Sequence, residues 1–287
     1  MIDICVNLHN GQFSEHLSTV LERAREAGVS GILGCATDLT LAQRNITLCE
    51  ESLARPNWPR LLTTAGVHPH DAETWQDSDD LHLATLCQSP WVRAVGECGL
   101  DFNRNYSAPT AQRKAFQAQI DIACQVQKPL FVHDRDSDGE VLGLLKDQDN
   151  LPPVVIHCFT GSAAELNGYL EAGFFIGITG WLCDAKRGQT LRELVARIPN
   201  DRILVETDAP FLRPHNAPPN DQLFANTEAA LGKYRRRNEP ALLAYVLSAL
   251  AEQRKQSPTE LAEFCTANAS TLFGFNHRPA DPELLGG

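Results

Sequence analysis

Four residues with metal-binding side chains follow short apolar runs of the sequence at equivalent places. These residues are Glu97, His133, His157 and Asp208. Imidazole nitrogens and carboxylate oxygens together suit a divalent metal ion, which polarises a phosphoryl or carbonyl group and lowers the pKa of a water molecule. A single histidine at a strand end is more often structural. Four candidate ligands at four strand ends instead indicate one shared metal site.

A repeated pattern of elements would bring these residues together. Eight short runs are rich in Val, Ile, Leu and Phe: 2–7, 30–36, 61–67, 92–97, 129–133, 153–157, 174–179 and 202–207. Longer stretches with helical spacing follow them, for example 14–27, 39–53, 109–127, 162–172 and 188–197. Continuous apolar runs are typical of parallel strands that are buried on both faces. The pattern therefore predicts an α/β fold, a (β/α)8 TIM-type barrel, with the four residues at its carboxyl-end mouth.

An open, doubly wound sheet is the alternative architecture, but no Gly-x-Gly-x-x-Gly motif follows the first run. Residues 239–253 and 257–273 show helical spacing and would complete the barrel. We expect a single hydrolase domain over residues 1–275. A Pro- and Asn-rich insertion, 213–236, is expected to form a flexible flap beside the mouth, and 276–287 a disordered tail.

Composition limits the possible partners. The chain of 287 residues is 43% hydrophobic and 21% charged, with a net charge of −11. This acidity argues against a broad basic surface that coats nucleic acid, although a small cationic pocket remains compatible with it. No apolar run reaches the ~18 residues of a membrane helix. Nine cysteines without a Cys-x-x-Cys pair suggest free thiols in the cytoplasm, and we expect a monomer that contacts no membrane.

Five sequence blocks carry a family resemblance. They are 66–70 (GVHPH), 96–101 (GECGLD), 157–161 (HCFTG), 206–210 (ETDAP) and 237–240 (RNEP). In this order they resemble the signature of the TatD family of metal-dependent deoxyribonucleases. The runs 6–8 and 99–105 look closest to members described as magnesium-dependent 3′-5′ exonucleases on single-stranded DNA and RNA. The resemblance implies that Glu97, His133 and His157 bind the metal, and that Asp208 binds metal or handles protons.

The first strand departs from the wider family. Most relatives carry His-x-His there, which holds a second metal ion, whereas this chain reads Cys5-Val6-Asn7. An Asn amide is a weak ligand without carboxylate support, and a Cys5 thiolate would favour soft metals. We therefore predict one firmly bound divalent ion, Mg by preference and Mn or Zn as alternatives. Cys98 and Cys158 follow predicted ligands, so strand alternation predicts packing roles that point away from the barrel centre.

The ligands suggest a hydrolytic mechanism in which Asp208 or Glu97 takes the proton of the attacking water. Phosphodiester cleavage also needs groups that stabilise charge on the phosphate. His68 and His70 are candidates, with a loop turn around Pro69 as the structural alternative. Arg135 and Arg237 are further candidates. For Arg135 the alternative is a surface ion pair, and the basic run 235–237 could equally be a solvated patch.

Two other functions remain open at this point. The first is hydrolysis of a small-molecule amide, lactone or phosphoester, because a barrel and a metal do not fix the substrate. The second is a non-catalytic barrel that binds nucleic acid. The family blocks favour the nuclease over the first, and the net charge and the intact set of ligands oppose the second.

Overall fold

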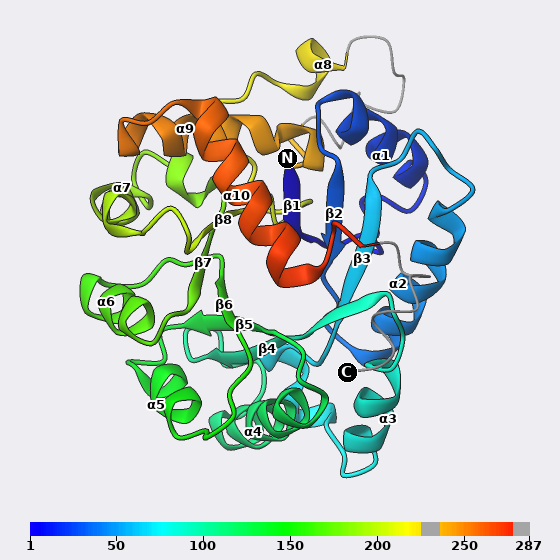
Figure 1. Ribbon diagram of the computed structural model, residues 1–287, viewed down its shortest axis with the longest axis vertical. Coiled ribbons are helices and arrows are strands. Elements are labelled where there is room, and N and C mark those ends of the chain that lie inside the picture. Colours follow the sequence, from blue (N-terminus) through cyan, green and yellow to red (C-terminus); the bar gives the residue numbers. More distant parts are fainter. Residues whose placement is uncertain (225–235, 278–287) are drawn as a thin grey trace.

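The predicted barrel is present in the computed structural model, which describes residues 1–224 and 236–277 (Figure 1). Its eight strands are β1 (Ile2–Val6), β2 (Gly31–Gly34), β3 (Arg60–Ala65), β4 (Val92–Asp101), β5 (Leu130–Arg135), β6 (Val154–His157), β7 (Phe175–Ile178) and β8 (Ile203–Val205). They form one sheet in chain order, and each neighbouring pair is parallel. The prediction of a (β/α)8 TIM-type barrel is confirmed.

The ring closes between β1 and the segment that follows β8. Val6 and Ala209 form a parallel bridge. The Asn7 N–H donates to the Ala209 carbonyl at 2.8 Å, and the Asp208 N–H donates to the Cys5 carbonyl at 3.0 Å. Closure thus depends on backbone groups at the carboxyl ends of these strands, and it brings Asp208 beside Cys5 and Asn7.

Helices surround the barrel (Figure 1). They are α1 (Leu17–Glu26), α2 (Leu39–Ser52), α3 (Asp79–Leu86), α4 (Pro109–Val126), α5 (Glu140–Lys146), α6 (Ala163–Glu171), α7 (Gln189–Leu194), α8 (Asn220–Leu223), α9 (Leu243–Arg254) and α10 (Pro258–Phe273). The 3-10 turns are η1 (Pro69–Thr74), η2 (Gly180–Cys183), η3 (Val195–Arg197) and η5 (Pro240–Leu242). None of the helices in the described ranges combines the length and hydropathy that crossing a membrane requires.

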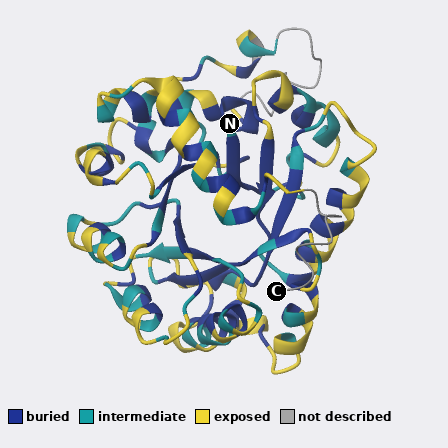
Figure 2. Ribbon diagram, in the orientation of Figure 1, coloured by how far each residue is buried: buried dark blue, intermediate teal, exposed yellow. Residues whose placement is uncertain are grey.

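Local sequence signals explain several helix ends. Ser162 and Glu165 form a capping box at the start of α6, in which each side chain accepts a backbone N–H of the other residue. Asp38 caps α2 by accepting from the Leu41 N–H at 2.8 Å. α10 ends at Gly274 in the left-handed conformation. Every residue of β1, β2 and β6 is buried, and most of the strand ribbon is dark blue in Figure 2. This burial on both faces accounts for their continuous apolar sequences.

Several strand boundaries differ from the sequence prediction, and the largest difference is in β4. β4 continues to Asp101 rather than ending at Glu97, and its register with β5 shifts between Gly96 and Cys98. A bulge of this kind adds a residue that the alternating pattern does not anticipate. β8 is shorter than 202–207, and the residues after Val205 carry side chains of the site.

The predicted insertion is described in part. Residues 213–224 contain α8, and the Arg213 side chain donates to the Ala217 carbonyl at 3.1 Å and to the Asn220 side chain at 3.2 Å. Residues 225–235 of the predicted flap and 278–287 of the predicted tail lie outside the described residues. The described part of the insertion contributes no residue to the wall of the cavity described next.

Candidate active site

A cavity of about 820 Å³ opens at the carboxyl ends of the strands. Its wall includes all four predicted ligands, Glu97, His133, His157 and Asp208. Glu97, His133 and His157 lie on the neighbouring strands β4, β5 and β6, and Asp208 follows β8; the carboxyl ends of these parallel strands meet at the same mouth. The sequence-predicted set is therefore brought together in space.

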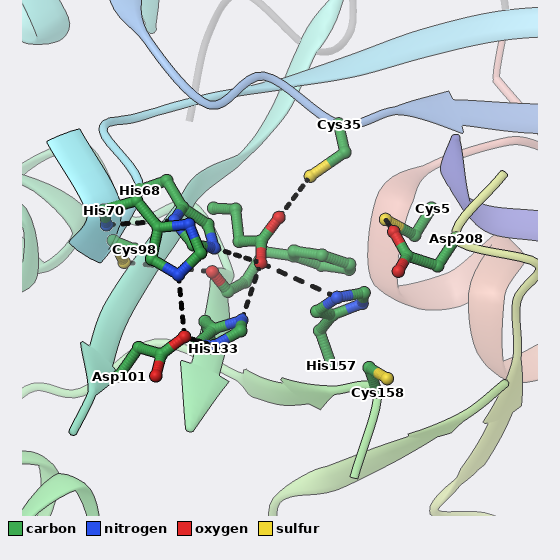
Figure 3. A network of polar contacts seen from close by, with 12 residues as sticks. Cys5, Cys35, His68, His70, Cys98, Asp101, His133, His157, Cys158 and Asp208 are labelled. Carbon is green, nitrogen blue, oxygen red and sulfur yellow. Dashed lines mark hydrogen bonds and ion pairs between the residues drawn. The ribbon is translucent and has the colours of Figure 1, made fainter. Parts of the chain in front are cut away.

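Glu97 lies at the centre of the cluster, and the histidines around it, His68, His133 and His157, are drawn in Figure 3. Its Oε1 atom is 2.9 Å from His133 Nδ1, 3.1 Å from His68 Nε2 and 3.6 Å from His157 Nε2. Its second oxygen, Oε2, accepts from the Cys35 thiol at 3.1 Å. The carboxylate and two of its imidazole partners, those of His68 and His157, are buried. Three imidazoles therefore converge on one buried carboxylate oxygen.

Two glycines permit this placement of Glu97. Gly96 and Gly99 both have φ near +140°, a conformation that side chains disfavour. A Cβ atom would lie 2.2 Å from the Phe131 carbonyl oxygen at Gly96, and 1.9 Å from the His133 carbonyl oxygen at Gly99. Only glycine fits where β4 passes this close to β5. The bulge between these glycines turns Glu97 into the mouth.

Two carboxylates orient the histidines, and sequence reasoning assigned them no role. Glu206 Oε2 lies 2.7 Å from His157 Nδ1, and Glu206 Oε1 accepts the Cys158 N–H at 2.6 Å. Asp101 Oδ2 lies 2.7 Å from His70 Nε2 and 3.4 Å from His133 Nε2. Carboxylates in such positions fix the ring orientation of metal-binding histidines. Glu206 precedes Asp208 by two residues and stands in the block 206–210, and these were the sequence signals for it.

Asp208 contacts the first strand. Its Oδ1 atom accepts from the Asn7 side-chain amide at 3.1 Å and from the Cys5 thiol at 3.7 Å. Asn7 and Asp208 line the cavity, whereas Cys5 is fully buried behind it. The residues that replace the His-x-His pattern therefore still reach the predicted site, as an amide and a thiol.

The electrostatics of the cluster are strongly coupled. Burial alone would raise the pKa of Glu97, but the surrounding imidazoles hold this pKa well below its usual value. Burial alone would lower the pKa of His157, but Glu206 and Glu97 raise it to about 10. In His133, Asp101 and Glu97 outweigh burial and raise the pKa to about 9. Burial raises the pKa of Asp208 to about 7. The carboxylates thus stabilise positive charge on the imidazoles around them.

The donor set fits a divalent cation. Three groups have ligand atoms within 4.8 Å of one another: Cys5–Glu97–His157, His68–Glu97–His133 and His157–Cys158–Asp208. His133 Nε2 makes no hydrogen bond of good geometry with the described residues, and its nearest carboxylate oxygen, Asp101 Oδ2, lies 3.4 Å away. A divalent ion would supply the positive charge that the imidazoles otherwise supply by protonation. Mixed nitrogen and oxygen donors are compatible with several ions, so the arrangement does not select one.

The four predicted phosphate-contacting residues fall into two groups. His68, His70 and Arg135 line the cavity. His68 also caps η1, as the loop-turn alternative anticipates, by accepting the His70 N–H at 3.1 Å. Arg135 donates to the Thr160 hydroxyl at 2.7 Å. Arg237 does not line the cavity; its buried guanidinium pairs with Glu239 at 2.7 Å and lies over the Phe13 ring. We therefore leave Arg237 out of the site.

The predictions for the two cysteines had different outcomes. Cys98 is a buried packing residue whose thiol approaches the Phe131 carbonyl at 3.8 Å, as predicted. The packing role of Cys158 is wrong, because Cys158 lines the cavity. β6 ends at His157, and Cys158 has a φ of 46°, so strand alternation no longer applies to it. Cys158 instead shares a possible ligand group with His157 and Asp208.

A parallel barrel with imidazoles and carboxylates gathered at its carboxyl-end mouth is typical of metal-dependent barrel enzymes. The family model of TatD-related DNases matches residues 2–274. A curated relative from Citrobacter rodentium, named 3′-5′ ssDNA/RNA exonuclease TatD, is 43% identical over 98% of this chain and 100% of its own length. The chain belongs to the TatD-related DNase family, so its resemblance to that family is confirmed.

Solved structures agree with this assignment. A TatD family hydrolase from Entamoeba histolytica has a TM-score of 0.82 at 25% identity, covering 95% of this chain and 97% of that one. A TatD homologue from Escherichia coli K12 has a TM-score of 0.81 at 27% identity, covering 96% and 98%. The family is one of hydrolases that act on phosphodiester bonds of nucleic acid, as the sequence blocks led us to expect.

Proposed function

We propose that this chain is a metal-dependent 3′-5′ exonuclease that hydrolyses single-stranded DNA or RNA. The convergence of three imidazoles and two carboxylates on one barrel mouth carries the proposal. The name of the curated relative, which matches along its whole length, supports the polarity and the single-stranded substrate. The family membership favours this function over hydrolysis of a small-molecule amide or lactone.

In this proposal Glu97, His133, His157 and Asp208 hold the ion. When bound, the ion supplies Lewis-acid polarisation of the phosphoryl group and a water of lowered pKa. Glu206 and Asp101 keep the imidazoles of His157 and His133 in their orientation.

Asp208 is the better candidate for the proton acceptor. Both oxygens of Glu97 are engaged, one by the imidazoles and the other by the Cys35 thiol. The hydrogen bonds of the Asp208 side chain with described residues all end on Oδ1. Its Oδ2 can therefore face the attacking water, as general base catalysis requires. His68, His70 and Arg135 lie where they can donate to phosphate oxygens.

The family fixes neither the ion nor the surroundings of the protein. We propose Mg²⁺ because hard phosphate oxygens and carboxylates favour it, with Mn²⁺ or Zn²⁺ as alternatives. The nine cysteines, which all lie in the described ranges, are free thiols. Free thiols persist in reducing compartments, so we propose a cytoplasmic location. A monomer is the simplest assembly, because every proposed ligand comes from one chain.

The experiment uses one single-stranded oligonucleotide labelled at either end, with Mg²⁺ or with a chelator. We expect the 3′ label to leave as a mononucleotide at once, while the 5′ label moves down a ladder of shortened strands. The chelator should stop both, and added Mg²⁺ should restore them. Cleavage that persists in chelator would refute metal dependence. Immediate loss of the 5′ label would refute the polarity.

A further inference from the structure

Two exposed aromatic side chains line the cavity, and they follow different strands. Tyr106, in the segment after β4, is 65% exposed, and Phe211, in the segment after β8, is 47% exposed. Both line the cavity. In a ring of eight strands in chain order, β4 and β8 are four places apart and lie across the barrel from each other. The cavity therefore has one open aromatic ring on each of two opposite sides.

Each ring is tied to the proposed metal site. The Tyr106 ring meets the His70 ring edge to face, with centroids 4.7 Å apart, and His70 contacts Asp101. The Phe211 N–H donates to the Asp208 carbonyl at 2.9 Å. Aromatic side chains that are exposed at a fixed place are suited to stacking on flat ligands. The Tyr106 ring is thus placed against the reacting centre by a ring contact, and Phe211 by its backbone.

Cationic groups lie on the same wall between these sides. The guanidinium carbons of Arg135 and Arg187 lie 5.1 Å and 4.4 Å from the centroid of the Trp181 ring, and all three residues line the cavity. Asp184 also binds Arg187 at 2.7 Å, which holds this side chain in place. Guanidinium groups over an indole are preorganised donors for phosphate. Such a combination of open aromatic rings and arginines is typical of surfaces that bind single strands.

We propose that the cavity binds a single strand through its bases, with one base stacked on Tyr106 and another on Phe211. We call this pair of rings the clamp. This inference rests on the proposed function and extends it to the mode of substrate binding. The two bases belong to the nucleosides on either side of the bond that is cut, while Arg135 and Arg187 contact an adjacent phosphate. Bases inside a duplex are already stacked on their neighbours and offer no open face. The clamp therefore selects unpaired ends.

The test compares Tyr106→Ala and Phe211→Ala on three strands of equal length. The first strand is intact. The second lacks one base, on one side or the other of the first bond that is cut. The third lacks all bases. We expect each variant to lose at least about fivefold in kcat/KM on the intact strand, the lower end of stacking per base. The loss should shrink on the strand that lacks the partner base and vanish on the base-free strand.

Two controls keep the test specific. Tyr106→Phe keeps the ring and should recover the rate that Tyr106→Ala loses. Phe264→Ala removes another aromatic side chain that is 43% exposed, on α10 and outside the cavity wall, and should have no effect. Equal losses on intact and base-free strands would overturn the clamp, as would unchanged rates in both alanine variants. If the unmodified protein cleaves none of the strands, the proposed function fails; if it cleaves all three equally well, only the clamp fails.

Discussion

The two sides of the barrel mouth carry different ligand chemistry. The imidazole side consists of His68, His70, Glu97, Asp101 and His133, on or after β3, β4 and β5. The thiol side consists of Cys5, Asn7 and Asp208, on or after β1 and β8. His157 lies between them, within reach of Glu97 and of Asp208 (Figure 3).

The two sides differ in how many carboxylates support their possible ligands. On the imidazole side every ring has a carboxylate partner, because Glu97 serves His68 and His133 and Asp101 serves His70. The thiol side has one carboxylate, and its Oδ1 is occupied by an amide and a thiol. Hard ions bind carboxylates and imidazoles more readily than neutral amides or thiols. We infer that the imidazole side, with His157 and Asp208, holds the only firmly bound hard ion.

The largest effect is expected from His133→Ala on the imidazole side. This change removes a ligand without touching the apolar core, so metal-dependent cleavage should fall to background while circular dichroism stays unchanged. His157→Ala should behave in the same way. His82→Ala, an exposed histidine on α3, is the matched control and should keep full activity. Near-normal activity in either ligand variant would remove that residue from the site.

Glu206→Gln and Asp101→Asn should have smaller effects. These changes remove the charge that orients His157 and His133 but keep the ligands themselves. Loss of such supporting carboxylates typically costs 10–100-fold in metal affinity or activity. Metal affinity measured by competition with a chelating dye, alongside kcat, would check both. An unaltered affinity in both variants would contradict their role as orienting partners.

Replacing the ligands of the thiol side by histidines should raise the number of metal ions bound per chain rather than the rate of cleavage. Cys5→His together with Asn7→His creates a His-x-His pattern on the first strand. Positions i and i+2 of a strand point to the same side, so both rings can reach Asp208. Calorimetric titration with Mn²⁺ should then detect a second site. A variant that folds, by circular dichroism, and still binds a single ion would contradict this reading of the first strand.

The smallest effect is expected from Cys5→Ser. A buried thiol that contacts Asp208 contributes little to a hard ion, so the Mn²⁺ affinity should stay the same within error. The affinity for Cd²⁺, which prefers sulfur, should fall. Cys98→Ser is the matched control, since this buried thiol contacts a backbone carbonyl of β5 instead. A clear loss of Mn²⁺ affinity in Cys5→Ser alone would make Cys5 part of the hard-ion site.

The barrel could be predicted from the sequence because its strands are buried on both faces and its helices repeat between them. The convergence of Glu97, His133, His157 and Asp208 followed from the same rule, since the carboxyl ends of parallel strands share one mouth. Asp101 was missed because β4 carries a bulge and runs four residues beyond Glu97. A bulge depends on the contact between two strands, which a linear pattern does not contain.

Other residues were misjudged for related reasons. Cys158 was assigned to packing because alternation was extended past the end of β6, where the backbone turns to a positive φ. Arg237 belonged to a conspicuous basic run, yet its partner, Glu239, is two residues away in the chain and keeps the guanidinium buried. Local sequence spacing identifies which residues can do chemistry, while tertiary contacts decide which of them face the cavity.

The most direct test of the difference between the two sides is the number of hard ions in the unmodified protein. The metal-free chain would be titrated with Mn²⁺ by calorimetry, with bound ions counted independently by elemental analysis after gel filtration. We predict one tight site per chain, and a second only as a weak one or none. Two tight sites per chain would contradict the account, because the thiol side would then complete a binuclear centre with residues that we consider too weak for a hard ion.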